Sequence, residues 1–197
     1  MKILVLGGTQ FVGKHLLTEC IAREHEITIF NRGLTNPYTY NGFIENLYGD
    51  RYSNDYSQLV NRNWDVVIDV PSFKPNIVKE AMDVLYDNVS TYVFISTISV
   101  YDINKNLDKT YIDYCNDKLE TERLFNGKEL KSLIFRPGIL CGEGDNTQRF
   151  DYTTNGIYWK GTDSLVEDYT TVEDFVKFVV DLIENNNRGV YEYVRYR

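Results

Sequence analysis

The strongest constraint on the fold is the way the sequence opens: an apolar run passes directly into a glycine-rich turn and then a helix. Residues 3–6 are continuously apolar, which is typical of a strand buried on both faces. Residues 7–13 form the turn, and the apolar positions that follow recur at helical spacing. A strand, a glycine turn and a helix in this order predict the first unit of a parallel α/β sheet.

The same alternation continues along the chain. Strands are expected at residues 27–30, 65–70, 92–96, 133–135 and 189–194, with a weaker one at 42–48. Helices are expected from Pro75, through 114–124 and over 172–184. The pattern predicts an α/β fold with a Rossmann-like, doubly wound parallel sheet in three layers. We expect one domain over residues 1–197, in which the irregular residues 141–168 serve as a small substrate or lid segment.

Composition narrows the choice of partners. The 197 residues carry a net charge of −8, which argues against nucleic acids and anionic membranes as partners. Three widely spaced cysteines favour a reducing compartment, so a cytoplasmic location is expected. The first apolar run is too short for a signal peptide or a membrane span, and no Cys/His cluster has metal-ligand spacing. These features favour a small-molecule substrate and no metal.

The glycine turn is a candidate phosphate site, because a helix N-terminus offers unpaired N–H groups to an anion. Gly7 would make the tight turn, Gly8 would allow close approach and Gly13 would let the helix pack on the sheet. Thr9, Gln10, Phe11 and Val12 complete the candidate cofactor-binding turn. The spacing departs from the usual G-x-G-x-x-G, so a plain glycine-rich turn is the alternative.

The end of the second expected strand bears on the choice of cofactor. Asn31 and Arg32 stand where a carboxylate would bind the ribose of NAD(H). A guanidinium there favours the 2′-phosphate, so NADP(H) is preferred and NAD(H) stays possible. The alternative is a solvated surface arginine. Asp50, which follows the third strand, could accept a hydrogen bond from an adenine amino group, and Asp69 at the end of the fourth could line the site.

Tyr114 and Lys118 lie four residues apart on an expected helix, so they share a face. A lysine charge near a phenol lowers the pKa of the phenol, and such a tyrosine can exchange a proton with a carbonyl or alcohol oxygen. The spacing alone carries little weight, because 16 tyrosines make chance pairs common. Tyr101 and Lys105 form a second pair, but in a turn-like run. A half-buried Tyr114 that only packs is the alternative.

These features together resemble the short-chain dehydrogenase/reductase superfamily, and most closely its extended or atypical branch, the NAD-dependent epimerase/dehydratase family. The motifs occur in the family's order and are the glycine turn, Asn31-Arg32-Gly33, Gly49-Asp50-Arg51, the run 92–97 with Ser99-Val100-Tyr101, the Tyr114/Lys118 pair and Arg136-Pro137-Gly138. The resemblance covers about residues 1–142 and, more weakly, 171–194. The C-terminal substrate lobe is much reduced.

The resemblance implies a Rossmann-like sheet and specific roles for individual residues. Tyr114 would be the catalytic acid/base and Lys118 its electrostatic partner. Thr97 fits best as the hydroxyl of the triad, with Ser96 second. The other implied cofactor contacts are Arg51, Val70, Pro71, Pro137 and Gly138. A homodimer is also implied, through the helices that contain Met82, Leu85 and Leu124.

The function expected from these features is an NAD(P)-dependent oxidoreductase or an epimerase/dehydratase-like enzyme. Its substrate would be a small carbonyl or alcohol compound, or one derived from a sugar, and it would react by hydride transfer with a tyrosine as acid/base. One alternative is a non-catalytic, redox-sensing module that binds the dinucleotide. A second is a fold that binds no nucleotide, because Gln10 stands where the commoner motif has its middle glycine.

Overall fold

The computed structural model describes residues 1–34, 44–70, 74–162 and 164–194. Its main element is a seven-stranded parallel sheet in the order β11-β6-β5-β4-β1-β2-β3. The strands are β1 (Lys2–Leu6), β2 (Glu26–Asn31), β3 (Ile44–Tyr48), β4 (Trp64–Asp69), β5 (Val89–Ile95), β6 (Lys131–Pro137) and β11 (Gly189–Tyr193). The prediction of a doubly wound parallel sheet is confirmed.

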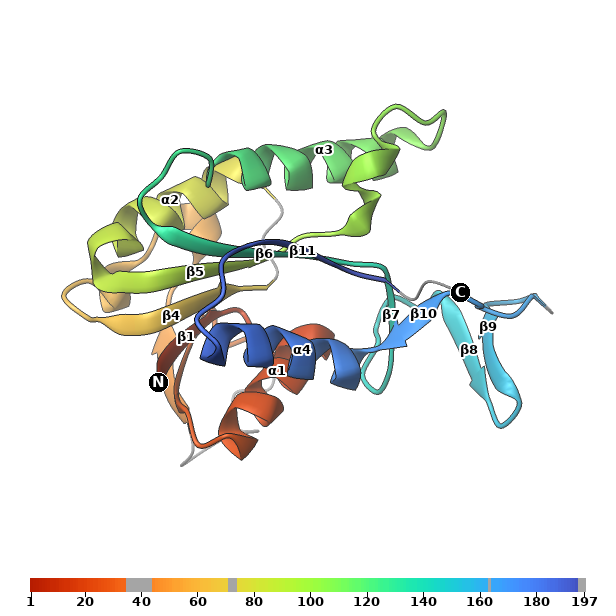
Figure 1. Ribbon diagram of the computed structural model, residues 1–197, viewed down its shortest axis with the longest axis horizontal. Coiled ribbons are helices and arrows are strands. Elements are labelled where there is room, and N and C mark those ends of the chain that lie inside the picture. Colours follow the sequence, from red (N-terminus) through yellow and green to blue (C-terminus); the bar gives the residue numbers. More distant parts are fainter. Residues whose placement is uncertain (35–43, 71–73, 163, 195–197) are drawn as a thin grey trace.

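Four helices cover the two faces of this sheet (Figure 1). Helices α2 (Pro75–Leu85) and α3 (Lys109–Arg123) lie on one face, and α1 (Phe11–Ala22) and α4 (Val172–Glu184) lie side by side on the other. Pro75 opens α2 as expected, because the first turn of a helix needs no N–H from that residue. The three-layer arrangement is therefore also confirmed.

The hydrophobic core is split by the sheet into two clusters, because successive side chains of a strand point to opposite faces. Val5 and Ile68 pack toward α1 and α4, whereas Leu4 and Val67 pack toward α2. Apolar burial on both faces explains why the central strands are continuous apolar runs.

Helix α2 supplies side chains to this core. Met82 and Leu85 are 1% and 0% exposed and pack in the cluster between α2 and the sheet. These two side chains therefore belong to the chain's own core, and a homodimer through the helices that contain them stays a prediction. Leu124, directly after α3, packs partly buried against the same cluster.

The glycine turn holds the start of α1 against β1. Gly7 and Gly8 have φ values of +92° and +87°, a region that side-chain-bearing residues rarely adopt. A Cβ on Gly13 would lie 2.4 Å from the Cα of Gly8, so the two backbones touch. Gly13 was expected to let the helix pack closely on the sheet. In the structure it lets the helix pack closely on the turn, at Gly8.

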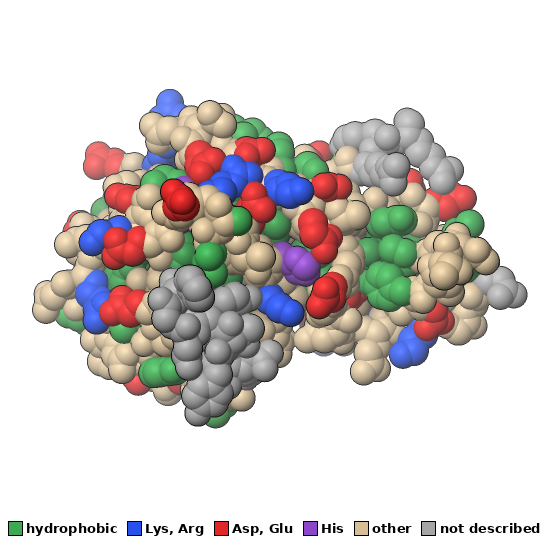
Figure 2. All heavy atoms as spheres, turned by 90° about the horizontal axis from the view of Figure 1, so that it is seen from below, with side chains coloured by type: hydrophobic (Ala, Val, Ile, Leu, Met, Phe, Trp, Pro, Cys, Tyr) green, Lys and Arg blue, Asp and Glu red, His purple; other side chains and the backbone are tan. Residues whose placement is uncertain are grey.

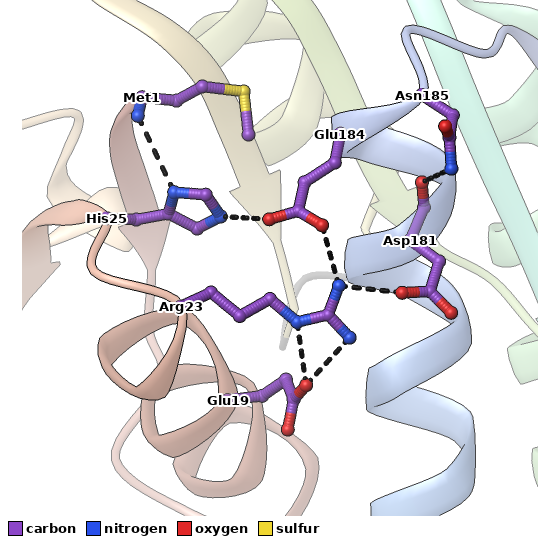
Figure 3. A network of polar contacts seen from close by, with 7 residues as sticks. All are labelled: Met1, Glu19, Arg23, His25, Asp181, Glu184 and Asn185. Atoms are coloured by element: carbon purple, nitrogen blue, oxygen red, sulfur yellow. Dashed lines mark hydrogen bonds and ion pairs between the residues drawn. The ribbon is translucent and has the colours of Figure 1, made fainter.

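Polar contacts tie α1 to α4 at the end of the sheet where the strands begin (Figure 3). Arg23 donates hydrogen bonds to Asp181 and Glu184 of α4, both at 2.6 Å, and to Glu19 at 2.8 Å. His25 lies 3.1 Å from the second carboxylate oxygen of Glu184. These groups orient the two helices at the end of the sheet opposite to its carboxyl edge.

The segment expected to be irregular, residues 141–168, contains regular structure in part. Strands β8 (Phe150–Thr153) and β9 (Gly156–Trp159) form an antiparallel hairpin. Strands β7 (Ile139–Cys141) and β10 (Tyr169–Thr171) form a parallel pair that joins the segment to the main body. The hairpin extends beyond the carboxyl edge of the main sheet (Figure 1). Among the described residues, no helix is both long and apolar enough to cross a membrane.

Replacing Gly13 by alanine should destabilise the fold, because the new methyl group meets backbone atoms of Gly8 that cannot rotate away. We expect a loss of about 1–3 kcal/mol in the free energy of unfolding, measured by urea denaturation. Thr18→Ala, on an exposed position of the same helix, is the control and should change stability by less than about 0.5 kcal/mol. An unchanged Gly13→Ala variant would show that the close contact does not constrain the turn.

Candidate functional site

A cleft runs along the carboxyl ends of β1, β4, β5 and β6, where ligands bind in open α/β sheets. It consists of two neighbouring hollows of about 280 and 640 Å³, and Val70 lines both. The smaller hollow lies beside the glycine turn and the larger one beside α3. Because β1 and β4 are adjacent in the sheet, the cleft sits at the point where the strand order reverses.

The smaller hollow brings together the expected cofactor residues of the first half of the chain. Its lining includes Gly7, Gly8, Thr9, Gln10, Asn31, Arg32, Asp50, Arg51 and Val70. The Asn31 side chain accepts a hydrogen bond from Gly33 N, and Asp50 accepts one from Tyr52 N. Arg32 is exposed and has no acidic partner in the described part of the chain.

The start of α1, which faces the cleft, is open to an anion. Gln10, the residue before the helix, makes no capping hydrogen bond with its side chain, and no acidic residue occupies the first turn. The N–H groups there keep their partial positive charge unopposed. The turn therefore fits a diphosphate by its donors as well as by its glycines.

Gln10 is engaged elsewhere: its side-chain oxygen accepts a hydrogen bond of 3.1 Å from the amide of Asn146. The segment around Asn146 follows β7 and lies over the start of α1, where Glu143 O contacts His15 Nε2 at 2.8 Å. The residue that departs from the glycine pattern thus links the turn to the C-terminal segment.

Arg51 and Asp69 occupy positions different from those expected. The Arg51 guanidinium is buried, and its two terminal nitrogens donate to the two carboxylate oxygens of Asp69 at 2.7 Å each. Tyr92 donates a further hydrogen bond of 2.8 Å to Asp69. The expectation that Asp69 lines the site is wrong, because its carboxylate is fully buried. Arg51 is among the residues that line the smaller hollow, although it is 8% exposed.

The larger hollow brings together the expected catalytic residues. Ser96, Thr97, Tyr114 and Lys118 line it, together with Pro137 and Gly138. Phe11 and Val12 line it from the glycine turn. Pro71, also expected at the cofactor, lies outside the described residues.

The environment of Tyr114 differs from the one expected. Burial raises the pKa of Tyr114, whereas a hydrogen bond with the Thr97 side chain and the charge of Arg149 lower it. Lys118 is not among the groups that shift it. The phenol is therefore protonated at neutral pH, so the expectation that the lysine charge lowers the pKa does not hold in this structure.

Lys118 is 5% exposed, and its ammonium donates a hydrogen bond of 2.7 Å to Ile95 O. Burial lowers the pKa of Lys118 to about 8, and the charges of Asp69 and Glu122 act in the opposite direction. The ammonium also lies 4.8 Å from the centre of the Phe94 ring.

Ser96 and Thr97 differ in what they contact. The Ser96 hydroxyl donates to the buried carboxylate of Glu122, which also accepts hydrogen bonds from Arg136. Thr97 caps the 3₁₀ helix Ile98–Asp102 and contacts Tyr114. Both residues line the larger hollow, and the ranking of Thr97 before Ser96 stays a prediction.

Glu122 was not identified from the sequence, although a signal was present. It follows Tyr114 and Lys118 at two successive four-residue steps on the same helix face. No group of three or more His, Cys, Asp or Glu side chains that could hold a metal occurs among the described residues.

Comparison with known proteins places these features in context. No family model matches the chain. It is 28% identical over 162 residues to the chloroplast stem-loop binding protein of 41 kDa b of Arabidopsis thaliana. That alignment covers 72% of this chain and 42% of the relative, so the chain spans less than half of the relative's length.

Solved structures share the fold over nearly the whole chain. A short-chain dehydrogenase/reductase from Veillonella parvula in complex with NADP matches with a TM-score of 0.72 at 15% identity, over 99% of this chain and 94% of that one. A UDP-glucuronic acid 4-epimerase from Bacillus cereus in complex with NAD matches with a TM-score of 0.74 at 18% identity, over 100% and 79%. At such identities these neighbours establish the shared fold, which is the fold that the motifs predict.

Stability should depend on pH through Lys118. Its pKa of about 8 in the folded chain lies below its ordinary value of 10.5, so the folded state binds fewer protons between these values than the unfolded state. Burying the charged lysine therefore costs stability below pH 8, and this cost disappears as the pH rises toward 10.5.

Lys118→Met should make this dependence measurable. The free energy of unfolding of the wild type minus that of the variant should rise by about 3 kcal/mol between about pH 7 and pH 11, measured by denaturant titration. The same substitution at the exposed Lys177 of α4 controls for removing a lysine charge as such. A difference between wild type and Lys118→Met that stays constant over this range would contradict the assignment.

Proposed function

We propose that this chain, which shares the fold of short-chain dehydrogenases/reductases, binds a nicotinamide dinucleotide along the cleft and reduces a small carbonyl compound or oxidises the corresponding alcohol. The observation that carries the proposal is the meeting of Tyr114, Thr97 and Lys118 in one hollow beside the glycine turn. An epimerase- or dehydratase-like reaction on a sugar-derived compound would use the same three residues.

The residues of the cleft fit the dinucleotide. The adenosine half would occupy the smaller hollow, with the diphosphate at the uncapped start of α1 and the 2′-phosphate at Arg32. The nicotinamide half would extend past Val70 toward Pro137 and Gly138. The contact between Gln10 and Asn146 would lie across the diphosphate position, so ligand entry requires this contact to adjust.

When bound, the dinucleotide supplies a hydride to the carbonyl carbon, or accepts one from the alcohol. In the direction of reduction, Tyr114 donates its proton to the substrate oxygen and regains one from solvent, so one proton is consumed per carbonyl reduced. The raised pKa of Tyr114 keeps it protonated at neutral pH, which suits this direction. Thr97 orients the same oxygen, and Lys118 supplies a buried positive charge nearby.

Arg32 is proposed to select NADP(H). Arg32→Gln should weaken NADPH binding by about 10- to 100-fold, because a hydrogen bond to a charged group contributes about 1.5–3 kcal/mol. Calorimetric titration with NADPH and NADH would measure this, and the NADH affinity should not change. Arg62→Gln, which removes an arginine remote from the cleft, should leave both affinities as they are. Equal affinity of the wild type for both dinucleotides would overturn the preference.

Tyr114 is proposed as the proton donor. Tyr114→Phe should retain NADPH affinity and lose turnover by about 10²- to 10⁴-fold on carbonyl compounds that the wild type reduces, followed by NADPH absorbance. Tyr101→Phe is the matched control, because Tyr101 belongs to the other tyrosine–lysine pair and lines neither hollow. Full turnover by Tyr114→Phe, or loss in Tyr101→Phe alone, would rule out the assignment.

A non-catalytic, redox-sensing module is the second candidate. The observation that favours it is the state of Lys118, whose ammonium is hydrogen-bonded to Ile95 O and does not lower the pKa of Tyr114. This module would bind NADPH with an affinity that depends on Arg32, and no carbonyl compound would be turned over.

Nucleic acid is not the proposed ligand, although the curated relative is named for stem-loop binding. The net charge of −8 disfavours phosphate-rich partners. The face formed by α1 and α4 carries acidic and basic side chains intermixed, without a continuous basic stretch (Figure 2). A cytoplasmic, homodimeric enzyme stays our proposal, and the three buried free cysteines are consistent with a reducing compartment.

A further inference from the structure

One charged side chain at the far end of the larger hollow has no part in the reaction described so far. Arg149 lines this hollow together with Tyr114, Thr147 and Trp159. Its charge is close enough to Tyr114 to lower the pKa of the phenol. Arg149 is exposed, so the part of the hollow that it lines is open to solvent.

The guanidinium of Arg149 is held in place from two sides. Its Nε donates a hydrogen bond of 3.0 Å to the Thr147 hydroxyl, and its central carbon lies 5.0 Å from the centre of the Phe150 ring. Phe150 is buried and packs against Trp159 of the hairpin, with ring centres 5.1 Å apart. A guanidinium fixed by its Nε and by an aromatic face keeps its two terminal nitrogens available for a bidentate contact.

Arg149 also has no carboxylate partner among the described residues. Within the described residues, Arg23, Arg51, Arg62 and Arg136 all contact carboxylates, and Arg149 contacts none. Arg32, Arg123 and Arg188 also contact no carboxylate there, but of these four only Arg32 and Arg149 line the cleft. Arg32, which lines the smaller hollow, is the other arginine of the cleft without a carboxylate partner among the described residues.

We propose that Arg149 binds an anionic group of the substrate, a carboxylate or a phosphate, while the carbonyl of the same molecule meets Tyr114 and Thr97. This inference rests on the proposed function. The hollow of about 640 Å³ must also hold the nicotinamide end of the dinucleotide, which leaves room for a small molecule. The substrate class is therefore a short keto acid, or an aldehyde or ketone that carries a phosphate. Trp159 and Ile139 add apolar surface to the lining of the same hollow.

The test compares charged and neutral members of matched pairs on the NADPH-saturated protein. Levulinate is paired with methyl levulinate, and dihydroxyacetone phosphate with dihydroxyacetone, and binding is measured by calorimetry. The anionic member of at least one pair should bind about 10- to 100-fold more tightly than its neutral partner, as expected for hydrogen bonds to a charged group. The pair that shows the preference identifies carboxylate or phosphate as the group recognised.

Arg149→Gln should abolish this preference and leave the affinity for NADPH unchanged. Lys160→Gln removes an exposed charge from the residue directly after the hairpin, outside the hollow, and should keep the preference. Arg149→Lys keeps the charge without the bidentate geometry and should retain only part of it.

Three results would overturn the proposal: equal binding of both members in every pair, an anion preference that persists in Arg149→Gln, or weaker NADPH binding by Arg149→Gln. The last would assign Arg149 to the dinucleotide. Repeating the titration without NADPH separates this proposal from the proposed function. An Arg149-dependent anion preference in the free protein supports the anion site even if NADPH does not bind, whereas NADPH binding without that preference leaves only the dinucleotide function standing.

Discussion

The contact between the backbones of Gly8 and Gly13 is the constraint on which the rest of the site depends. It fixes the start of α1 against the end of β1, because neither residue has a side chain to keep the two segments apart. The first-turn N–H groups of α1 are thereby directed at the cleft, and the rest of the helix lies against α4. Since α4 follows β10 directly, the position of α1 also sets where the C-terminal segment meets the cleft.

Buried charges support both hollows from beneath. Arg51, Asp69 and Tyr92 form a hydrogen-bonded group beside the smaller hollow, and Ser96, Glu122 and Arg136 form another beside the larger one. A buried charge is costly unless it is paired, and in both groups the carboxylate accepts from at least two donors. Burial lowers the pKa of Lys118, and the negative charges of Asp69 and Glu122 raise it and so offset part of that decrease. The polar floor of the cleft thus keeps a buried lysine close to its charged form.

The sequence predicted the main sheet because its strands alternate with helices and are buried on both faces, which leaves long apolar runs. The hairpin formed by β8 and β9 was not predicted, since each strand is only four residues long and too short for a clear periodic pattern. The residues of the larger hollow were identified through one helix and one strand end. The pairing of Arg51 with Asp69 and the contact of Gln10 with Asn146, 136 residues apart, depend on how strand ends converge. Local sequence patterns do not predict which strand ends come together in this way.

The distribution of positive charge along the cleft follows from this arrangement. Arg32 lies at one end, the uncapped start of α1 near the middle and Arg149 at the other end, and neither arginine has a carboxylate partner among the described residues. An acidic protein repels anions in general, so these positions concentrate anion binding in the cleft. A dinucleotide accounts for the first two through its phosphates. The phosphates of the dinucleotide do not account for Arg149, whose charge acts on Tyr114. An anionic group on the substrate, which must lie beside Tyr114 to react, would account for it.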